Sequence, residues 1–550
     1  MNILYIYNNF QDSNFEPGNE NKIYSYYLDV GKMTSQNVTN LNNQQRFNGL
    51  ALELRDNYCE YIYSLNKLFI DTGLIFEKKL SLYFLTDLSN KRTELFNTYP
   101  SICHLNLIQE RVKFINIDKI ILDGCEKNFI EMLSSVFKGK EIEIRNTPRP
   151  QKAQNNFWAQ AKFLIKTFVE IIFLRLYRFS APKEKTIKKL FLTRYPLHFH
   201  AVNREEKYGE LVGENDYFLI SIITDGSHQN LKFNRYVSAL TGLRSFPAKF
   251  LILDDWLSIV DVIGTFFKLF PLSIKYSKLL RHRYCFRNMD ITGFIHFELK
   301  QSLPRIPRLL MFKKAIRKVF SDYIVGDFYY YLHEYCYGRF FTYILQTYFP
   351  RVNKIGFQHG PASRRKLLYY LAENELDSGQ NDFINHLPIP DKVLAEDEQS
   401  KRVYEEAGYK NVRVMDRIYR LSYLENINRE NVIPNTVLVA CGLHDGELLL
   451  NALSNEMLNT SDKTYYFKLH PRAHNSHTID LIKGLNTENL KIAEKDLTYY
   501  LSTVDEVIVT YSSVGYEAHL LGIPARIIDI PGKINESHLL DLKQSEGLNI

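Results

Sequence analysis

Two segments near the C-terminus place polar groups directly after an apolar strand. The first, Tyr465–Arg472, reads YYFKLHPR and contains His470 and Pro471. The second, Val507–Pro524, reads VIVTYSSVGYEAHLLGIP. A strand followed by small hydroxyls, a glycine and a helix presents free backbone N–H groups and a positive helix end to an anion. Because parallel strands end at one edge of a sheet, the two segments predict a shared site for a nucleotide phosphate.

The side chains of the first segment suit this role individually. His470 can donate to a phosphate oxygen or protonate a leaving group, and Pro471 fixes the backbone immediately after it. Lys468 and Arg472 add positive charge nearby. The alternative interpretation is an ordinary strand that ends at an X-Pro turn.

The second segment offers hydroxyl donors. Ser512 and Ser513 can donate to phosphate, and Glu517, roughly one helical turn further on, can accept from ribose hydroxyls. The same residues also fit a capped helix, with Ser513 as the N-cap and Glu517 as a first-turn acid. Both interpretations are compatible, because a capped helix N-terminus is also an anion site.

Three positions are candidates for the base that accepts a proton from an acceptor hydroxyl. In Ile355–Pro361 (IGFQHGP) a buried strand runs into His359, whose imidazole can take a proton near neutral pH. Asp225 and Asp445 each precede a glycine and are the carboxylate alternatives. An Asp-Gly pair is also an ordinary turn, and the histidine can simply bond its own turn.

Further residues are predicted to line the same cleft. Gly442 and His444 follow the first strand of the C-terminal part, where donor-binding loops usually lie. On the acceptor side the candidates are Gln358, Arg194 and Arg339.

The elements that must position these groups alternate between strands and helices, which predicts α/β units with parallel sheets. The strand-like runs are Asn2–Tyr7, Leu80–Leu85, Lys119–Leu122, Glu141–Ile144, Lys189–Leu192, Tyr217–Ile223, Phe250–Leu253, Tyr323–Val325, Lys354–Phe357, Lys392–Ala395, Thr436–Ala440, Tyr465–Leu469 and Val507–Thr510. Asn146–Asn156 and Asn426–Asn435 have the composition of breaks. We therefore expect an N-terminal α/β region (1–150), an acceptor-side Rossmann-like domain with a helical insertion (151–430) and a nucleotide-donor domain (431–550).

Two long helical segments are ambiguous. Phe157–Ser180 is about long enough to span a membrane, but Lys162, Lys166, Glu170 and Arg175 interrupt it. It is therefore predicted to be amphipathic, either packed on the protein or lying in a membrane interface. Asp327–Tyr348 predicts a helix with one apolar face, which favours core packing over a glycan platform.

Composition excludes several classes. The net charge of +7, from 69 Lys and Arg against 62 Asp and Glu, fits an anionic substrate or a membrane surface and not a nucleic acid. The 6 cysteines are scattered, which predicts no zinc site, no disulfide framework and a reducing cytoplasm. The N-terminus does not read as a signal peptide. We find no GxGxxG motif, no P-loop lysine and no convincing carboxylate pair, so we expect neither cofactor nor metal.

The order of QHG, KLHP and YSSVGYEAHLLGIP resembles bacterial GT-B transferases of capsule and surface-polysaccharide synthesis. That group includes Kdo transferases, sialyl- and polysialyltransferases and teichoic-acid glycerophosphotransferases. The resemblance implies two Rossmann-type domains that face a cleft, with an enlarged N-terminal region, and a cytidine-nucleotide donor. It also implies that His470, Ser512 and Ser513 contact the donor phosphate, and His359 matches the histidine before glycine of the glycerophosphotransferases.

The function implied is a cytoplasmic, metal-independent glycosyltransferase at the inner face of the cell membrane. It would transfer a CMP-activated acid sugar, sialic-acid-like or Kdo-like, to a glycan or lipid-linked glycan. One alternative is a CDP-glycerol or CDP-ribitol phosphotransferase, or a transferase that uses a UDP- or GDP-sugar. Another is a non-catalytic subunit that binds glycan or nucleotide.

Overall fold

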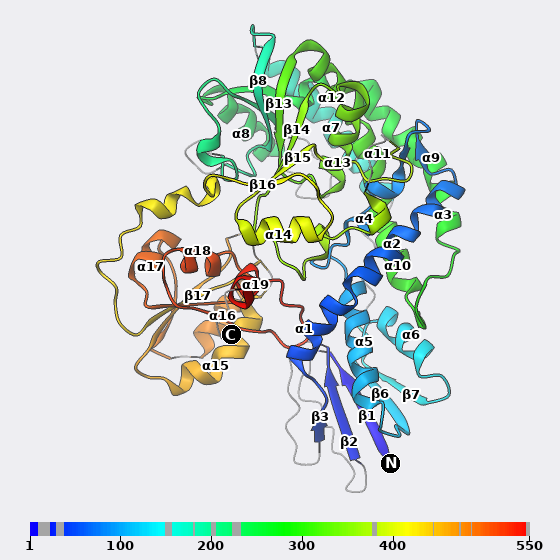
Figure 1. Ribbon diagram of the computed structural model, residues 1–550, viewed down its shortest axis with the longest axis vertical. Helices are drawn as coiled ribbons and strands as arrows, with labels where there is room; N and C mark the ends of the chain where they lie inside the picture. Colours follow the sequence, from blue (N-terminus) through cyan, green and yellow to red (C-terminus); the bar gives the residue numbers. More distant parts are fainter. Residues whose placement is uncertain are drawn as a thin grey trace.

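The structure is a computed structural model that describes residues 1–8, 22–28, 38–148, 157–179, 182–199, 205–222, 233–376, 382–443, 445–471, 473, 475–485 and 487–545. In this part of the chain the strands build three parallel sheets, which we call the N-terminal, middle and C-terminal sheets (Figure 1). The predicted α/β fold with parallel sheets is confirmed.

The N-terminal sheet has the strand order β3-β2-β1-β6-β7, and all neighbours are parallel. Its strands are β1 (Asn2–Tyr7), β2 (Lys22–Tyr27), β3 (Val38–Asn40), β6 (Lys119–Asp123) and β7 (Glu141–Arg145). The helices α1 (Gln44–Glu53), α5 (Thr98–Val112) and α6 (Lys127–Val136) belong to this region. The central strand β1 is almost wholly apolar and buried, as expected for a parallel sheet with helices on both faces.

The middle sheet has the order β10-β9-β8-β13-β14-β15-β16 and is also parallel throughout. Its strands are β8 (Thr186–Arg194), β9 (Tyr217–Ser221), β10 (Lys249–Ile252), β13 (Ile324–Tyr330), β14 (Asn353–Phe357), β15 (Lys392–Ala395) and β16 (Val412–Val414). Its helices are α7 (Phe157–Tyr177), α8 (Phe233–Arg244), α9 (Ile259–Leu279), α12 (Phe312–Asp322), α13 (Cys336–Tyr348) and α14 (Glu398–Glu406).

The C-terminal sheet has the order β19-β18-β17-β20-β21, again parallel. Its strands are β17 (Thr436–Ala440), β18 (Thr464–Lys468), β19 (Leu490–Ile492), β20 (Glu506–Val509) and β21 (Ala525–Ile527). The helices are α15 (Gly446–Asn459), α16 (Ser476–Gly484), α17 (Leu497–Thr503), α18 (Val514–Leu520) and α19 (His538–Ser545).

Short helices and two hairpins connect the N-terminal and middle regions. They are α2 (Arg55–Ser64), α3 (Asn66–Asp71), α4 (Asp87–Asn90), α10 (Thr292–Ser302), α11 (Arg305–Leu310), the pair β4 (Ile75–Phe76) and β5 (Leu80–Ser81), and the pair β11 (Cys285–Phe286) and β12 (Met289–Asp290). One apolar core runs through both regions, from Leu4 in β1 to Phe328 in β13. The C-terminal sheet instead packs its two faces into separate cores, so it forms a domain with its own interior.

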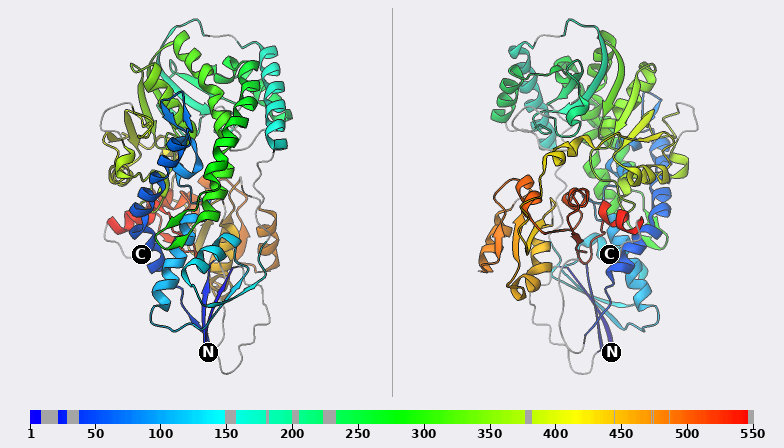
Figure 2. Two further views of the ribbon diagram at one scale, coloured as in Figure 1. Left: turned by 90° about the vertical axis from the view of Figure 1, so that its right-hand side faces the viewer. Right: turned by 60° about the vertical axis from the view of Figure 1, so that its left-hand side comes forward.

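Helix α19 ties this C-terminal domain back to the middle one, and the right view of Figure 2 shows this red helix beside the orange C-terminal domain. His538 lies 2.9 Å from the Asp397 carboxylate at the start of α14, and Asp541 pairs with Arg365 at 3.1 Å. The other ring nitrogen of His538 contacts the Ala362 carbonyl, so the imidazole donates on both sides. This double donation and the Asp397 charge outweigh burial and raise the pKa of His538, which favours the charged form.

Most predicted strands are confirmed within one to three residues, but Leu80–Leu85 is wrong. Only Leu80–Ser81 forms a strand, and Leu82–Leu85 is a 3₁₀ turn in which the Ser81 hydroxyl accepts from the Tyr83 amide. All four turn residues are buried, so the apolar run has no period that would distinguish a turn from a strand.

The helix predicted over Asp327–Tyr348 is half wrong. Its first part belongs to β13, and the chain passes through Leu332 at a φ of 67° before α13 begins at Cys336. Within α13 the predicted core packing is confirmed, because Phe340 and Ile344 are buried. Aromatic residues are common in strands as well as helices, so the run DFYYY at the start of this segment did not distinguish a strand from a helix.

In each sheet the strand order reverses beside the first strand, between β1 and β6, β8 and β13, and β17 and β20. Ligands of open α/β sheets bind beyond the carboxyl ends of the strands at such a switch point. The middle and C-terminal sheets face one cleft in this way, which confirms the predicted GT-B-like arrangement. None of the helices in the described part of the chain has the length and apolar character needed to cross a bilayer.

Candidate active site

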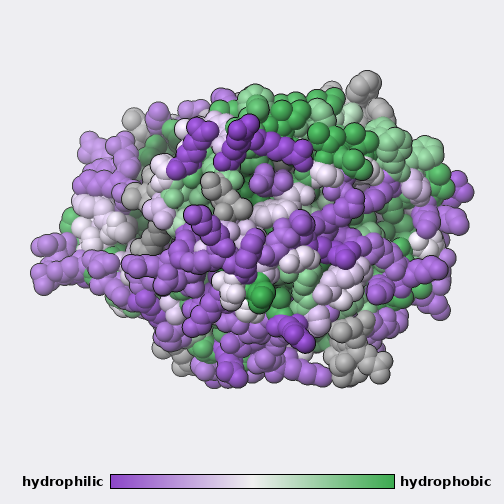
Figure 3. Space-filling view, turned by 90° about the horizontal axis from the view of Figure 1, so that it is seen from above, coloured by the Kyte–Doolittle hydropathy of each residue, from purple (hydrophilic) through white to green (hydrophobic). Residues whose placement is uncertain are grey.

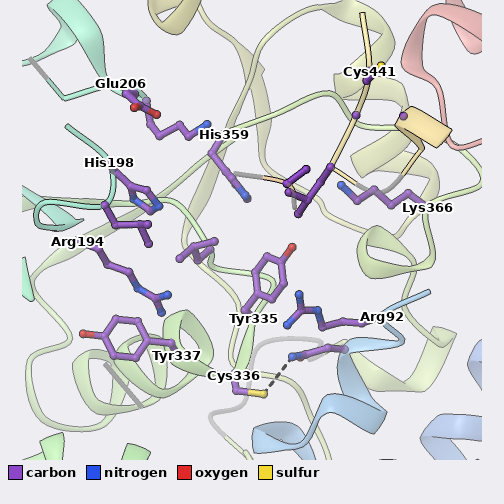
Figure 4. A pocket seen from close by; sticks show the side chains of 18 of the residues that line it. Arg92, Arg194, His198, Glu206, Tyr335, Cys336, Tyr337, His359, Lys366 and Cys441 are labelled. Carbon is purple, nitrogen blue, oxygen red and sulfur yellow. Dashed lines mark hydrogen bonds between the residues drawn. The ribbon is translucent and has the colours of Figure 1, made fainter. Parts of the chain in front are cut away.

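A cavity of about 850 Å³ lies between the carboxyl ends of the middle and C-terminal sheets (Figure 4). Its lining residues are Asn90, Arg92, Arg194, Leu197, His198, Glu206, Lys207, Arg305, Leu332, Tyr335, Cys336, Tyr337, His359, Lys366, Cys441, Gly442, Leu443, Gly446, Glu447, Ala473, Asn475 and Thr478. The lining is predominantly basic: the cations are Arg92, Arg194, Lys207, Arg305 and Lys366, and the acids are Glu206 and Glu447. We call it the cationic cavity, because this balance favours an anionic ligand.

Arg194 ends β8 and enters the cavity at the switch point of the middle sheet. Its side chain is buried, and the guanidinium lies 4.9 Å from the ring centre of Tyr337. Its Nε is buried without a hydrogen-bond partner among the described residues. A buried guanidinium nitrogen that lacks an acceptor is costly, so an anion that binds here gains a ready donor.

His359 follows β14 and is the predicted base that the structure brings into this cavity. In Figure 4 its imidazole points into the space between Arg194 and Lys366. The ring nitrogen Nδ1 is buried and has no hydrogen-bond partner in the described structure. Burial, followed by the charges of Lys207 and Lys366, lowers the pKa of His359 well below its usual value, so the ring is neutral and can accept a proton.

Gln358 and Arg339 support the site from behind rather than lining it. Gln358 is buried, accepts from the Glu396 amide at 2.9 Å and donates to the Ser400 hydroxyl at 3.0 Å. It also donates to the Gly360 carbonyl at 2.8 Å, which holds the turn that presents the histidine. Arg339 is buried in α13 and donates to the Ser89 hydroxyl at 2.8 Å. Of the three predicted acceptor residues, Arg194 alone reaches the cavity.

The C-terminal domain contributes two helix ends to the cavity. Gly446 is the first residue of α15, and Asn475 is the N-cap of α16. The first backbone N–H groups of each helix are therefore available to an anion, in the direction that the helix dipole favours. Gly442 leaves room for the ring of Tyr511, because a side chain at this position would meet that ring at 2.9 Å.

The segment that contains His470 and Pro471 lies beside these two helix ends. His470 is half-buried just after β18, and its carbonyl accepts from the Asn475 side chain at 2.9 Å. Lys468 turns away and donates to the backbone carbonyls of Lys495 and Ala493. His470, Lys468 and the exposed Pro471 are not part of the cavity lining. Arg472 lies outside the described residues.

Ser513 occupies the N-cap position of α18 without a side-chain capping bond, and neither Ser512 nor Ser513 lines the cationic cavity. The Ser513 hydroxyl donates to the Glu517 carboxylate at 3.1 Å, and the Tyr423 hydroxyl donates to the other oxygen at 2.6 Å. These two bonds engage both carboxylate oxygens of Glu517, which is buried. Ser512 contributes its carbonyl to the same turn, as acceptor of the Gly515 amide at 3.2 Å.

A second cavity, of about 720 Å³, lies between the N-terminal and C-terminal sheets. It is lined by Asn8, Leu28, Thr93, Glu94, Asn97, Pro100, Ser101, His104, Glu126, Phe129, Leu443, Asp445, Glu447, Leu448, Thr510, Tyr511, Ile528, Ile530, Gly532, Lys533, Ile534, Asn535 and Glu536. Among its described lining residues the acids are Glu94, Glu126, Asp445, Glu447 and Glu536, against the single cation Lys533, so we call it the acidic cavity. It shares Leu443 and Glu447 with the cationic cavity.

The alternative bases fall in different places. Asp445 is buried in the lining of the acidic cavity, where the Thr510 hydroxyl donates to its carboxylate. Asp225 and the donor candidate His444 lie outside the described residues.

Sequence reasoning missed most of the cations in the cationic cavity. Arg92 and Arg305 come from segments far from any predicted motif and reach the site only through the fold. Lys366 had a visible signal, because it ends the basic run Arg364–Lys366, which begins four residues after Gly360 of the QHG turn. Lys207 lies beyond β8, where a single lysine carries no pattern.

Comparisons with known proteins give low similarity. No protein-family model and no curated protein sequence matches the chain. Among solved structures, it is similar to a UDP-GlcNAc 2-epimerase from Neisseria meningitidis bound to UDP-GlcNAc, with 11% identity, 66% of this chain and 91% of that chain covered, and a TM-score of 0.34. For HepE from Anabaena in complex with UDP and glucose, the identity is 13%, the coverage is 66% of this chain and 90% of that chain, and the TM-score is 0.31. For the wall teichoic acid polymerase TagF, the identity is 11%, the coverage is 68% of this chain and 79% of that chain, and the TM-score is 0.28. Because these TM-scores lie below 0.5, we base the function on the geometry and charge of the cleft.

Proposed function

We propose that this protein is a glycosyltransferase of surface-polysaccharide synthesis that transfers an acid sugar, sialic-acid-like or Kdo-like, from a CMP-activated donor to a glycan. The observation that carries the proposal is the cationic cavity, where a neutral histidine lies among five cations between two sheet switch points. A CMP-linked acid sugar bears two anionic groups, a phosphate and a carboxylate, and both need the positive surroundings that this cavity provides.

In the proposed reaction His359 is the base. Its imidazole accepts the proton of an acceptor hydroxyl while that oxygen forms a bond to the anomeric carbon of the donor sugar. The bond between the anomeric carbon and the phosphate oxygen breaks, and CMP leaves with the electron pair. Arg194, Lys366 and the starts of α15 and α16 stabilise the charge that develops on the phosphate.

The donor contacts predicted from the sequence keep a place in this proposal. His470 and the pair Ser512 and Ser513 are proposed to contact the donor after closure of the C-terminal domain on the middle one. Asp445 and Asp225 are the alternative bases.

We further propose that the acceptor glycan occupies the acidic cavity. Uncharged sugar hydroxyls donate well to carboxylates such as Glu126 and Glu536, whereas a phosphate would be repelled. Because the two cavities share Leu443 and Glu447, an acceptor bound in the acidic cavity would lie next to a donor in the cationic cavity.

Transfer without a metal is part of the proposal, because the cations and helix ends supply the charge that a metal would otherwise provide. In the described part of the chain we find no group of three or more His, Cys, Asp or Glu side chains that could hold a metal ion. A cytoplasmic location is also part of the proposal, because the six cysteines are scattered along the sequence without the spacing of a disulfide framework.

The test is incubation with CMP-, CDP-, UDP- and GDP-activated donors, read by mass spectrometry of the acceptor glycan, with and without EDTA. We expect transfer from a CMP-activated acid sugar in both conditions. Transfer of glycerol phosphate or ribitol phosphate from a CDP donor, or of sugar from a UDP or GDP donor, would favour the alternative enzyme. Nucleotide binding without turnover of any donor would favour a non-catalytic subunit.

A further inference from the structure

Helices α7 and α9 pack against each other and leave a long apolar surface uncovered. Its exposed side chains, which we call the apolar face, are Ile165, Phe168, Ile172 and Leu176 on α7, and Val260, Ile263, Phe267, Phe270 and Ile274 on α9. Figure 3, seen from above, shows hydrophobic side chains gathered along one edge of the molecule. Phe267 and Phe270 are 70% and 74% exposed, which is far from the usual environment of phenylalanine.

The spacing shows that the apolar face is a continuous stripe on each helix. On α9 the exposed residues follow one another at intervals of three or four, from Val260 to Ile274. The opposite side of α9, which includes Val262 and Leu279, is buried in the protein. A helix at an ordinary protein surface is apolar inward and polar outward, whereas these helices are apolar on both sides. A patch of this kind marks a contact with another apolar phase.

The charged residues around the apolar face indicate what this surface contacts. All exposed charged residues on the two helices are cations: Lys162, Arg175, Lys268, Lys275 and Lys278. The acids on the two helices are otherwise engaged. Glu170 is buried and paired with Lys166 at 3.3 Å, and Asp261 accepts from Ser258 and pairs with Lys314 at 2.8 Å. Apolar side chains flanked by cations are complementary to a bilayer that contains anionic lipids.

The same charges disfavour a second copy of this chain as the occupant. Two apolar faces brought together would place lysines opposite lysines without any exposed acid on either helix to neutralise them.

A short structural path connects the apolar face to the cationic cavity. In α11, the guanidinium of Arg308 lies 4.1 Å from the ring centre of Phe163 in α7, while Arg305 at the start of the same helix lines the cavity. A bilayer held against α7 and α9 is therefore one helix away from the cleft.

We propose that α7 and α9 form the surface by which this protein docks on an anionic membrane, so that the cleft meets acceptors linked to lipid. The lipid-linked acceptor rests on the proposed function, whereas docking itself does not.

Docking is tested by flotation of the full-length protein with vesicles of phosphatidylcholine alone or with added phosphatidylglycerol, without donor or acceptor. We expect wild-type protein to float with the anionic vesicles. The double variant Phe267→Ser, Phe270→Ser should bind at least ~10-fold more weakly, because two large apolar side chains no longer enter the bilayer. The matched control is Phe114→Ser, which removes a 92% exposed phenylalanine elsewhere and should bind as wild type does.

The charge contribution is tested with Lys162→Gln, Lys268→Gln and Lys278→Gln combined. We expect roughly 100-fold weaker binding to the anionic vesicles, from about 1 kcal/mol per lysine, and little change on phosphatidylcholine alone. Lys491→Gln, at an exposed position in β19, is the control. Undiminished flotation of both the serine and the glutamine variants would overturn the proposal. So would a wild-type dimer that Phe267→Ser, Phe270→Ser converts to monomers without affecting flotation.

Discussion

The cationic and acidic cavities occupy equivalent positions and have opposite charge. Each lies where the switch point of the C-terminal sheet faces that of another sheet, the middle sheet for one and the N-terminal sheet for the other. The cationic cavity has five Lys or Arg residues against two acids, and the acidic cavity has five acids against one lysine. Topology thus locates both sites, but the side chains that follow the strands decide which ligand each can hold.

The two cavities also control protons differently. His359 in the cationic cavity has a lowered pKa, from burial and then from the charges of Lys207 and Lys366. Glu536 in the acidic cavity has a pKa raised to about 7, mainly by burial and partly offset by Lys366. His359 therefore stays in its proton-accepting form below neutral pH, whereas Glu536 changes its charge near neutral pH.

The largest expected effect is the loss of the proposed base, His359. His359→Ala should reduce transfer at saturating donor by ~10²–10⁴-fold while leaving nucleotide affinity within a few-fold of wild type. Single-turnover kinetics and calorimetry measure the two quantities separately. The control is His282→Ala, which removes an exposed histidine distant from His359 in the sequence. Normal turnover in His359→Ala together with inactivity of Asp445→Asn would transfer the role of base to the acidic cavity.

Next in size is the loss of one cation. Lys366→Gln or Arg194→Gln should weaken donor binding by roughly 10-fold or more, because each removes a charged donor to the phosphate or carboxylate. The acceptor KM should change much less. Rescue of binding by Arg194→Lys would show that charge matters more than the shape of the guanidinium. Equal losses of donor and acceptor affinity would contradict the separation of the two cavities.

The pH dependence should also differ between the sites. With a lowered pKa, neutral His359 persists below pH 6.5, so kcat should stay level from neutral pH down through 6.5 and fall only in more acid solution. Lys207→Gln removes one of the charges that lower this pKa and should move the acid limb to higher pH. A kcat that falls with a midpoint near 6.5 in the wild type would show that His359 is not held neutral.

The smallest effects concern acceptor binding. Ionised Glu536 accepts more hydrogen bonds than the protonated acid, so the acceptor KM should rise as pH falls through about 7. Glu536→Gln should remove this dependence, and Glu126→Gln should raise the acceptor KM a few-fold at any pH. Donor affinity serves as the internal reference, since it should not move in either variant.

The sequence predicted the fold better than the site. Strands such as Thr436–Ala440 are continuous apolar runs with turn residues after them, so both their existence and their limits could be read directly. Polar strands such as β2, with the sequence KIYSYY, gave no comparable signal and were missed. Among the site residues, His359, Arg194 and Gly442 were found because each lies at or just after the end of a strand. Arg92, Lys207 and Arg305 reach the cavity through tertiary packing, which leaves no local pattern.

The most direct test of the central claim is calorimetric titration with CMP and, separately, with cytidine. The wild-type protein should bind CMP and bind cytidine at least ~10-fold more weakly, because we propose that the cationic cavity recognises the phosphate. Lys366→Gln should lose most of that difference, and Glu126→Gln in the acidic cavity should keep it. Equal binding of CMP and cytidine by the wild type, or an unchanged preference in Lys366→Gln, would contradict the assignment of the cationic cavity as the donor site.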